Sequence, residues 1–216
     1  MKSPVIGDLL HVNKTLSKIK TSPLCIFYPR LGDVEKCKLY CFSDASLNNL
    51  QSGKSAGGFL VCLVNSAGQS CPLFWKSKTL RRVVRSTLAA ETTAMVDVLD
   101  IGYYFSYCLS EMLYCRQSDS LSNRIHNVSS FYCDKVLPIV AFTDNESLYR
   151  NSYATTMVNE YRLRIDLAII KQMLEKRELE GIHWLSSGKQ LADCLTKQGA
   201  NPLKLLCALE SGKLQL

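Results

Sequence analysis

The chain has 216 residues, a formal net charge of +7 and an apolar fraction of 47%. This length suits one domain with extensions, or at most two small ones, and the composition is that of a globular protein that can bury a sizeable core. The moderate positive charge permits a polyanionic partner but does not require one. No apolar run approaches the roughly 18 residues of a membrane span, so we expect no membrane partner.

The cysteines and the first residues bear on the compartment. The 10 cysteines are scattered and form no Cys-x-x-Cys pair, which argues against a zinc-ribbon site. Residues 1–14 lack the continuous apolar segment of a secretory signal. We therefore expect reduced, mostly buried thiols in an intracellular, cytoplasmic protein that is not secreted.

Hydrophobic periodicity predicts strands and helices in a definite order after a mixed lead-in at residues 1–36. The expected elements are a short helix at 7–20, strands at 38–43, 58–65 and 70–78, a long helix at 84–113, a strand at 137–143, a short helix from 146, a helix at 159–176, a strand at 181–186, and helices at 189–197 and 202–210. Ser86 or Thr87 can cap the long helix, and the polar stretch 116–130 is expected to form a loop. Three antiparallel strands followed by alternating helices and strands predict an α/β fold with a mixed five-stranded sheet and helices on its faces.

One strand of this sheet ends in acidic and polar residues. The apolar run 138–142 shows no alternation, which is typical of a strand covered on both faces, and it leads directly into Asp144 and Asn145. In open α/β sheets, ligands bind outside the carboxyl ends of the strands. Asp144 is therefore a candidate site residue, and Asp44, at the end of the strand at 38–43, would emerge beside it if the two strands are parallel neighbours.

Two further acids have ordinary explanations when each is considered alone. Glu91 lies in the apolar stripe of the long helix, where it either reaches out to solvent from the edge of the stripe or is buried beside a cation. Asp193 lies in the first turns of the helix expected at 189–197, where an acid commonly complements the helix dipole.

The four acids together favour a metal site. Magnesium binds hard oxygen ligands and keeps several waters, so a few carboxylates suffice. Two divalent ions about 3.5–4 Å apart can hold the attacking and leaving oxygens of a phosphodiester displacement. Without a cation, four acids at one sheet edge would repel one another. A basic chain with a local acidic cluster therefore indicates metal-dependent chemistry on a nucleic acid.

Five short motifs, in chain order, carry a resemblance to a known family: FSDAS, GGF, WKSKTLRRVVRSTLAAE, TDN and QLADCLTK. In this order they resemble the ribonuclease H domain of copia-type retrotransposon polyproteins over about residues 38–200. The resemblance implies a ribonuclease H-like fold with catalytic, metal-binding acids at Asp44, Glu91, Asp144 and Asp193. It also implies two Mg²⁺ ions, with Mn²⁺ as an alternative.

The reaction implied by the resemblance is hydrolysis of the RNA strand of an RNA–DNA hybrid during reverse transcription. Asp44 would bridge both ions, Glu91 and Asp144 would hold the leaving-group side, and Asp193 the nucleophile side. The implied partners are the hybrid and the reverse transcriptase of the same polyprotein, within the virus-like particle of the parent element. Two alternatives stay open: a catalytically inactive nucleic-acid-binding relic, and an exonuclease on the same fold, which the sequence Asp44-Ala45-Ser46 disfavours because such enzymes carry an Asp-x-Glu pair there.

Further residues are candidates for contact with nucleic acid. The stretch from Trp75 to Arg85 is rich in cations, which release counterions when they bind phosphates, although a solvated face with a core tryptophan explains it equally well. The candidate contacts are Ser43, Ser46, Lys76, Lys78, Arg81, Arg82, Arg85 and Asn145. Asp166 is expected to pair with Arg162, four residues earlier on the same helix, and His183, inside a strand, is given no catalytic role.

The resemblance also divides the chain. Residues 1–36 look like the connection that follows the reverse transcriptase in such polyproteins, residues 37–200 like the ribonuclease H-like domain with a loop insertion at 116–130, and residues 201–216 like a C-terminal helix and tail.

Overall fold

The computed structural model describes residues 5–21, 25–50, 53–114, 137–156, 158–197 and 199–216. The predicted loop insertion at 116–130 lies outside these ranges. Among the described helices, none is both long and apolar enough to cross a membrane.

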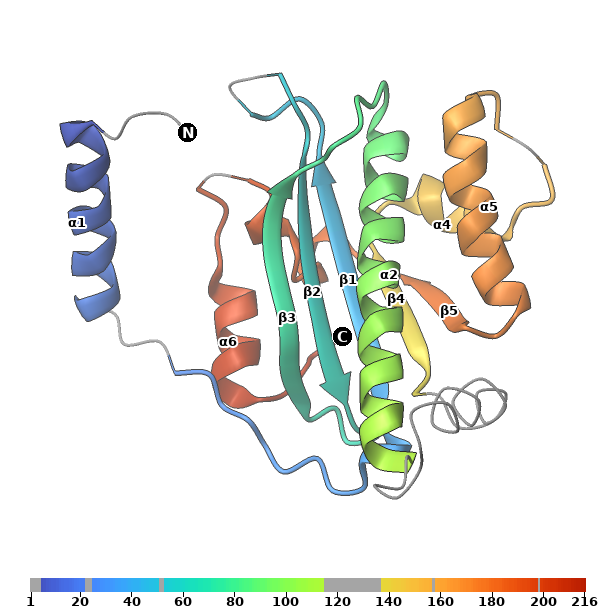
Figure 1. Cartoon of the computed structure of the whole chain (residues 1–216), viewed down its shortest axis with the longest axis horizontal. Coiled ribbons are helices and arrows are strands. Elements are labelled where there is room, and N and C mark those ends of the chain that lie inside the picture. The colour runs from blue at the N-terminus through green and yellow to red at the C-terminus, as the bar shows by residue number, and fades with distance from the viewer. Residues whose placement is uncertain (1–4, 22–24, 51–52, 115–136, 157, 198) are drawn as a thin grey trace, which may run out of the picture.

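The described residues form one five-stranded mixed sheet (Figure 1). Its strands are β1 (Lys38–Ser46), β2 (Ala56–Val64), β3 (Ser70–Thr79), β4 (Ile139–Thr143) and β5 (Leu179–Trp184), in the spatial order β3-β2-β1-β4-β5. β1 pairs antiparallel with β2, and β2 with β3, whereas β4 lies parallel to β1 and β5 parallel to β4. The predicted α/β fold, with a mixed sheet of three antiparallel strands followed by parallel ones, is thereby confirmed.

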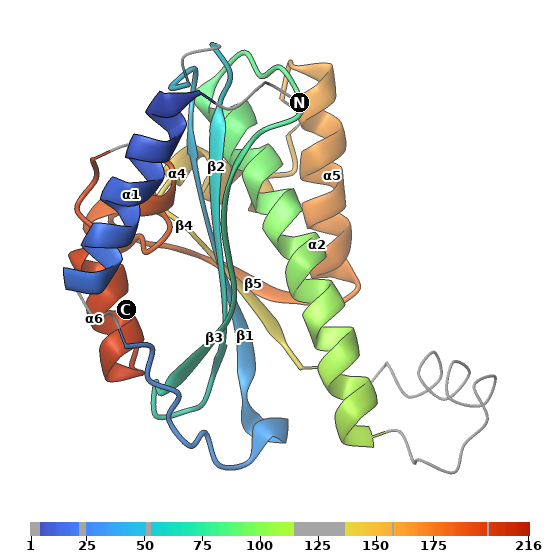
Figure 2. The ribbon, with the colours of Figure 1, turned by 60° about the vertical axis from the view of Figure 1, so that its left-hand side comes forward.

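Helices cover both faces of the sheet, as Figure 2 shows nearly edge-on. One face carries α2 (Thr87–Tyr114), α4 (Glu146–Tyr153) and α5 (Tyr161–Glu175), and the other carries α6 (Leu203–Ser211) with the short 3₁₀ helices η2 (Ser187–Lys189) and η3 (Asp193–Leu195). Ser86 caps α2, since its Oγ accepts a hydrogen bond from the Ala89 N–H at 3.1 Å.

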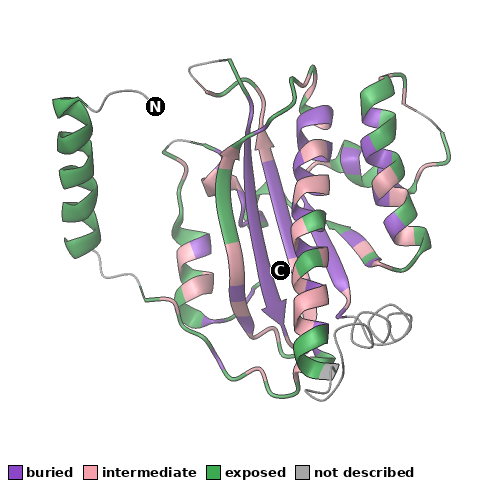
Figure 3. Cartoon of the chain, viewed as in Figure 1, coloured by how far each residue is buried: buried purple, intermediate pink, exposed green. Residues whose placement is uncertain are grey.

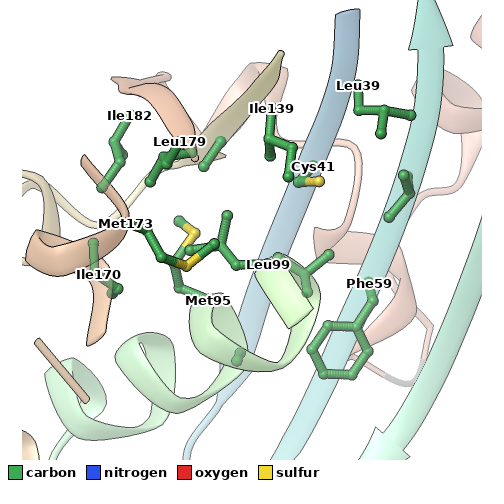
Figure 4. Close-up of a cluster of buried hydrophobic side chains, with 14 of the residues drawn as sticks. Leu39, Cys41, Phe59, Met95, Leu99, Ile139, Ile170, Met173, Leu179 and Ile182 are labelled. Carbon is green, nitrogen blue, oxygen red and sulfur yellow. The ribbon is translucent and has the colours of Figure 1, made fainter. Parts of the chain in front are cut away.

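Each face of the sheet has its own hydrophobic core. On the α2 face, Met95 and Leu99 pack with Ile139 and with Met173 of α5 in the larger cluster (Figure 4). On the α6 face, a smaller cluster forms around Phe42, whose ring stacks on the ring of Phe142 with centroids 4.7 Å apart. Because β2 lies between the two cores, all nine of its residues are buried (Figure 3). The central strands are therefore held rigidly from both sides.

The lead-in contains helix α1 (Ile6–Thr21), none of whose residues is buried (Figure 3). A 3₁₀ turn, η1 (Val34–Lys36), precedes β1. Between them, Phe27 donates a backbone hydrogen bond to the Leu209 carbonyl at 2.8 Å. This bond ties the extended part of the lead-in to α6.

Two expectations about local structure need correction. β1 continues past residue 43 to Ser46, so Asp44 lies inside a strand. The predicted helix at 189–197 is wrong: this stretch holds the last residue of η2 and the separate 3₁₀ helix η3. Gln190 lies between them, is buried, and donates from its Nε2 to the Ser43 carbonyl at 2.9 Å. This tertiary hydrogen bond holds the segment against β1 in a conformation that its apolar periodicity did not predict.

Candidate active site

Two strands bring the first two acids together, as the sequence predicted. The parallel register of β1 and β4 pairs Phe42 with Phe142. Asp44 and Asp144 each lie two residues after these phenylalanines, so both emerge at the same edge of the sheet. Asp44 is 3% exposed and lies opposite Gly58 of β2. Asp144 directly follows the last residue of β4 and is partly buried.

The long helix α2 supplies the third acid. Glu91 is 6% exposed, and carboxylate oxygens of Asp44, Glu91 and Asp144 all lie within 4.8 Å of one another. Burial, together with the charges of Asp44 and Asp144, raises the pKa of Glu91 to about 9. Burial likewise raises the pKa of Asp44, against the lowering effect of its hydrogen bond from Thr196. The alternative in which Glu91 reaches out to solvent is therefore wrong.

The three-acid cluster fits a divalent cation. Among the described residues, the Glu91 Oε2 atom is buried and has no hydrogen-bond partner. A buried, unpaired carboxylate oxygen costs free energy that a bound cation would recover. Hard oxygen donors converging from three sides are the ligands that Mg²⁺ and Mn²⁺ take. The residues present therefore suit the ion that the sequence led us to expect.

The fourth predicted acid, Asp193, lies beside the cluster but outside this three-residue set. It begins η3, and its Oδ1 forms an ion pair with the Nζ of Lys197, four residues later. Its negative charge is close enough to raise the pKa of Asp44, although burial and the charge of Asp144 contribute more. Asp193 is thus near the site, but its charge is already balanced by the ammonium of Lys197.

Four residues that sequence reasoning left out position this segment. Gln190 is bonded to β1 as described above, the Thr196 hydroxyl donates to the Asp44 Oδ2, and Asn49 donates from its Nδ2 to the Thr196 carbonyl at 3.0 Å. Gly58 allows the close approach, because a Cβ there would lie 2.8 Å from the Ala192 carbonyl oxygen. The sequence motifs Gly-Gly-Phe and Gln-Leu-Ala-Asp include Gly58, Gln190 and Ala192, but only the fold shows that the two motifs are in contact.

The end of β5 contributes a residue that sequence reasoning did not name as a site residue. Trp184 donates from its indole Nε1 to the Asp144 carbonyl at 3.1 Å, while half of the residue stays exposed. On the other side, the Asn145 side chain caps α4 by accepting from the Leu148 N–H at 2.9 Å. These bonds fix the backbone on both sides of the Asp144 carboxylate.

The two serines predicted to contact nucleic acid differ in accessibility. Ser43 is fully buried and its hydroxyl lies 3.8 Å from the Met95 sulfur, so it offers nothing to a ligand outside the protein. Ser46 ends β1 and is partly exposed. Ser46 therefore stays a candidate, whereas the position of Ser43 contradicts a role in direct contact.

The predicted basic stretch divides into paired and unpaired cations. Lys78 forms an ion pair with Asp97 at 2.9 Å. Arg82 forms an ion pair with Asp166 at 2.7 Å. The predicted pairing of Asp166 with Arg162 is therefore wrong. Within this basic stretch, the exposed cations that have no ion pair to another described residue are Lys76, Arg81 and Arg85.

Two aromatic positions complete the surroundings. Trp75 is 50% exposed, which contradicts a core tryptophan at that position. His183 is exposed, and its ring stacks on Phe142 with centroids 5.5 Å apart. This contact is on the side of β5 away from the α2 core, because Phe142 belongs to the cluster on the α6 face. The expectation that His183 has no catalytic role stays a prediction.

Comparison with known proteins gives similarities to solved structures alone. No protein-family model matches the chain, and no curated protein matches it. RNase H1 from the halophilic archaeon Halobacterium salinarum NRC-1 is 16% identical, with a TM-score of 0.47 over 74% of this chain and 94% of that one. LC11-RNase H1 in complex with an RNA/DNA hybrid is 15% identical, with a TM-score of 0.46 over 74% of this chain and 94% of that one.

A viral protein is also among the similar structures. The foamy viral protease-reverse transcriptase in complex with an RNA/DNA hybrid is 10% identical, with a TM-score of 0.43 over 81% of this chain and 21% of that one. Function is therefore inferred from the residues of this chain.

Proposed function

We propose that this chain is a metal-dependent endoribonuclease that hydrolyses the RNA strand of RNA–DNA hybrids. The observation that carries the proposal is the convergence of Asp44, Glu91 and Asp144 at one edge of the sheet, with a buried Glu91 oxygen that lacks a partner. Such an arrangement is costly for folding alone, because burial and nearby negative charges oppose the ionised forms of Asp44 and Glu91. It is favourable once a divalent cation binds.

The acids of this chain would hold the metal, with Mg²⁺ as the expected ion and Mn²⁺ as an alternative. When bound, a pair of such ions activates water and stabilises the charge on the leaving 3′ oxygen. Asp44 is the proposed shared ligand, because its carboxylate lies within 4.8 Å of those of Glu91 and Asp144 and also interacts with the charge of Asp193. Glu91 and Asp144 would complete the leaving-group side, and Asp193 the nucleophile side. Trp184 and Asn145 would keep Asp144 in place.

The substrate is proposed to be bound by its backbone and shape. Lys76, Arg81 and Arg85 are exposed and free of ion pairs in the described residues, so they can contact phosphates without first breaking a bond. A hybrid is read by its groove shape, phosphates and 2′-hydroxyls, and not by its sequence. Ser46, Asn145 and Lys78 are secondary candidates for such contacts, because Asn145 and Lys78 already have partners.

The motif order also supports a proposal about origin. We propose that the chain derives from a copia-type retrotransposon polyprotein, with residues 1–36 as the connection from the reverse transcriptase. The fully exposed helix α1 agrees with this, because a connecting segment would be covered by the preceding domain. In this view the chain acts in reverse transcription, inside the cytoplasmic virus-like particle of the element.

The test is cleavage of a hybrid with a labelled RNA strand in Mg²⁺, comparing the wild type with D144N and with D8N as a matched control. Asp8 lies on the exposed helix α1, far along the chain from the acids. We expect D8N to cleave like the wild type and D144N to lose about 100-fold or more, because several kcal/mol of charge stabilisation disappear. Hybrid binding by the wild type without cleavage would instead indicate the inactive, nucleic-acid-binding alternative.

A further inference from the structure

We propose that Lys197 is a tethered cation that competes with a second divalent ion for the Asp193 carboxylate. In the substrate-free chain, the carboxylates Asp44, Glu91 and Asp144 would then hold one ion, and the Lys197 ammonium would stand in for another. This inference rests on the proposed function, because it refines how the same site takes up metal.

The position of Lys197 is fixed by its neighbour. Thr196 bonds to the Asp44 carboxylate through its hydroxyl, and its carbonyl accepts from Asn49 at 3.0 Å. Lys197 follows Thr196 directly, so its backbone is anchored beside the acids. From there its Nζ reaches the Asp193 Oδ1, and its side chain stays 52% exposed. The backbone of Lys197 is thus anchored, while its ammonium is exposed enough to leave Asp193 for another anion.

The charge of Lys197 acts on the acids around it. Its pKa is raised, chiefly by the hydrogen bond with Asp193 and further by the charges of Asp44 and Asp144. In return its positive charge opposes the effect of burial on Asp44 and on Glu91. One lysine therefore interacts with all four predicted acids, which is what a stand-in for a metal ion must do.

Competition follows from this arrangement. A divalent ion that takes Asp193 as a ligand would compete with the ammonium for one carboxylate, whose Oδ1 already pairs with Lys197. A lysine that leaves Asp193 needs another anion, and a phosphate of a bound substrate is a suitable one, because lysine binds phosphate as a point charge. Arrival of the substrate would release Asp193 for the second ion.

The experiment is titration of the substrate-free chain with Mn²⁺ and with Mg²⁺ by isothermal calorimetry. The variants are K197M, K197R, D193N and the double variant K197M/D193N, and K189M serves as the matched control because Lys189 is an exposed lysine in η2. Circular dichroism and urea unfolding check that each variant is folded, and K197R keeps the charge if K197M does not fold.

We expect the wild type and K189M to bind one ion. K197M should bind a second ion, or bind metal at least about fivefold more tightly, which is the lower end of typical coupling between two ligands. This gain in metal binding should vanish in the K197M/D193N variant, because the Asp193 carboxylate is missing. K197R should resemble the wild type, because it keeps the positive charge.

Equal stoichiometry and affinity in K197M and wild type would overturn the inference, as would a gain that persists without Asp193. The proposed function fails separately. If the wild type binds hybrid and metal but does not cleave, while K197M still gains metal, the nuclease proposal is refuted and the role of Lys197 stands. If the wild type cleaves and K197M gains no metal, the reverse holds.

Discussion

Replacing Glu91 with glutamine is expected to stabilise the metal-free chain against unfolding, and to do so far more near pH 8 than near pH 5. Burial raises the pKa of Glu91 from 4.5 to about 9 in the folded chain. Between these two values the folded state keeps a proton that the unfolded state has lost. Stability therefore falls as the pH rises through this window, since the folded state binds more protons.

The magnitude follows from the width of that window. Each pKa unit corresponds to about 1.36 kcal/mol, so the penalty is below about 1 kcal/mol near pH 5 and at most about 5 kcal/mol near pH 8. Glutamine has nearly the same shape and no ionisation, so it escapes this penalty. We expect E91Q to gain about 1–5 kcal/mol near pH 8 and to match the wild type near pH 5.

The assay is urea unfolding followed by circular dichroism at both pH values, with EDTA present. E175Q is the control, because Glu175 is exposed at the end of α5 and its replacement should change stability by no more than about 0.5 kcal/mol. Saturating Mg²⁺ should make the wild type more stable than E91Q, since an ion that binds the native state stabilises the wild type more than a variant lacking one carboxylate. An E91Q gain that is absent near pH 8, or equal at both pH values, would refute the reasoning.

Two further predictions concern how the site and the basic stretch are positioned. G58A should lower the free energy of unfolding by about 1–3 kcal/mol and reduce hybrid cleavage, because the new methyl group would overlap the segment that carries Asp193. The control is G181A, whose methyl group would make an ordinary contact at 3.6 Å and should change neither stability nor cleavage. Equal behaviour of the two variants would contradict the argument that Gly58 is needed for close approach. R82M should destabilise the chain by about 1–3 kcal/mol in urea unfolding, because it leaves the nearly buried Asp166 without its ion pair. R81M should leave stability unchanged but weaken hybrid binding and reduce its salt slope by about one, as expected for one lost phosphate contact; the opposite pattern would assign the two arginines the wrong roles.

The sheet was predictable because its signals are local. Alternation and apolar runs of five to ten residues identify strands, and the run at 138–142 reads as a strand covered on both faces, as it is in the structure. Parallel pairing of that strand with β1 then dictates that Asp44 and Asp144 emerge together. The three-acid cluster was therefore within reach of the sequence, because its members are placed by regular elements.

The failures share a physical cause, which is tertiary contact overriding a local pattern. Leu191, Ala192 and Leu195 have helical spacing, yet hydrogen bonds to β1 hold the segment in 3₁₀ turns. Asp166 has an arginine four residues before it, yet it pairs with Arg82, which is 84 residues away in the sequence. The cation that pairs with this buried acid comes from the connection between β3 and α2 and not from its own helix.

The same override explains why Lys197 belongs to the site. On an isolated helix, Asp193 and Lys197 would form an ordinary surface pair four residues apart, worth a few tenths of a kcal/mol. The docking of residues 190–196 on β1 and β2 moves that pair to the edge of the sheet where the other acids converge. A pair that would otherwise be a minor surface feature thereby becomes part of the charge balance of the site. The residues that dock the segment, Gly58 above all, should therefore affect metal binding without touching metal.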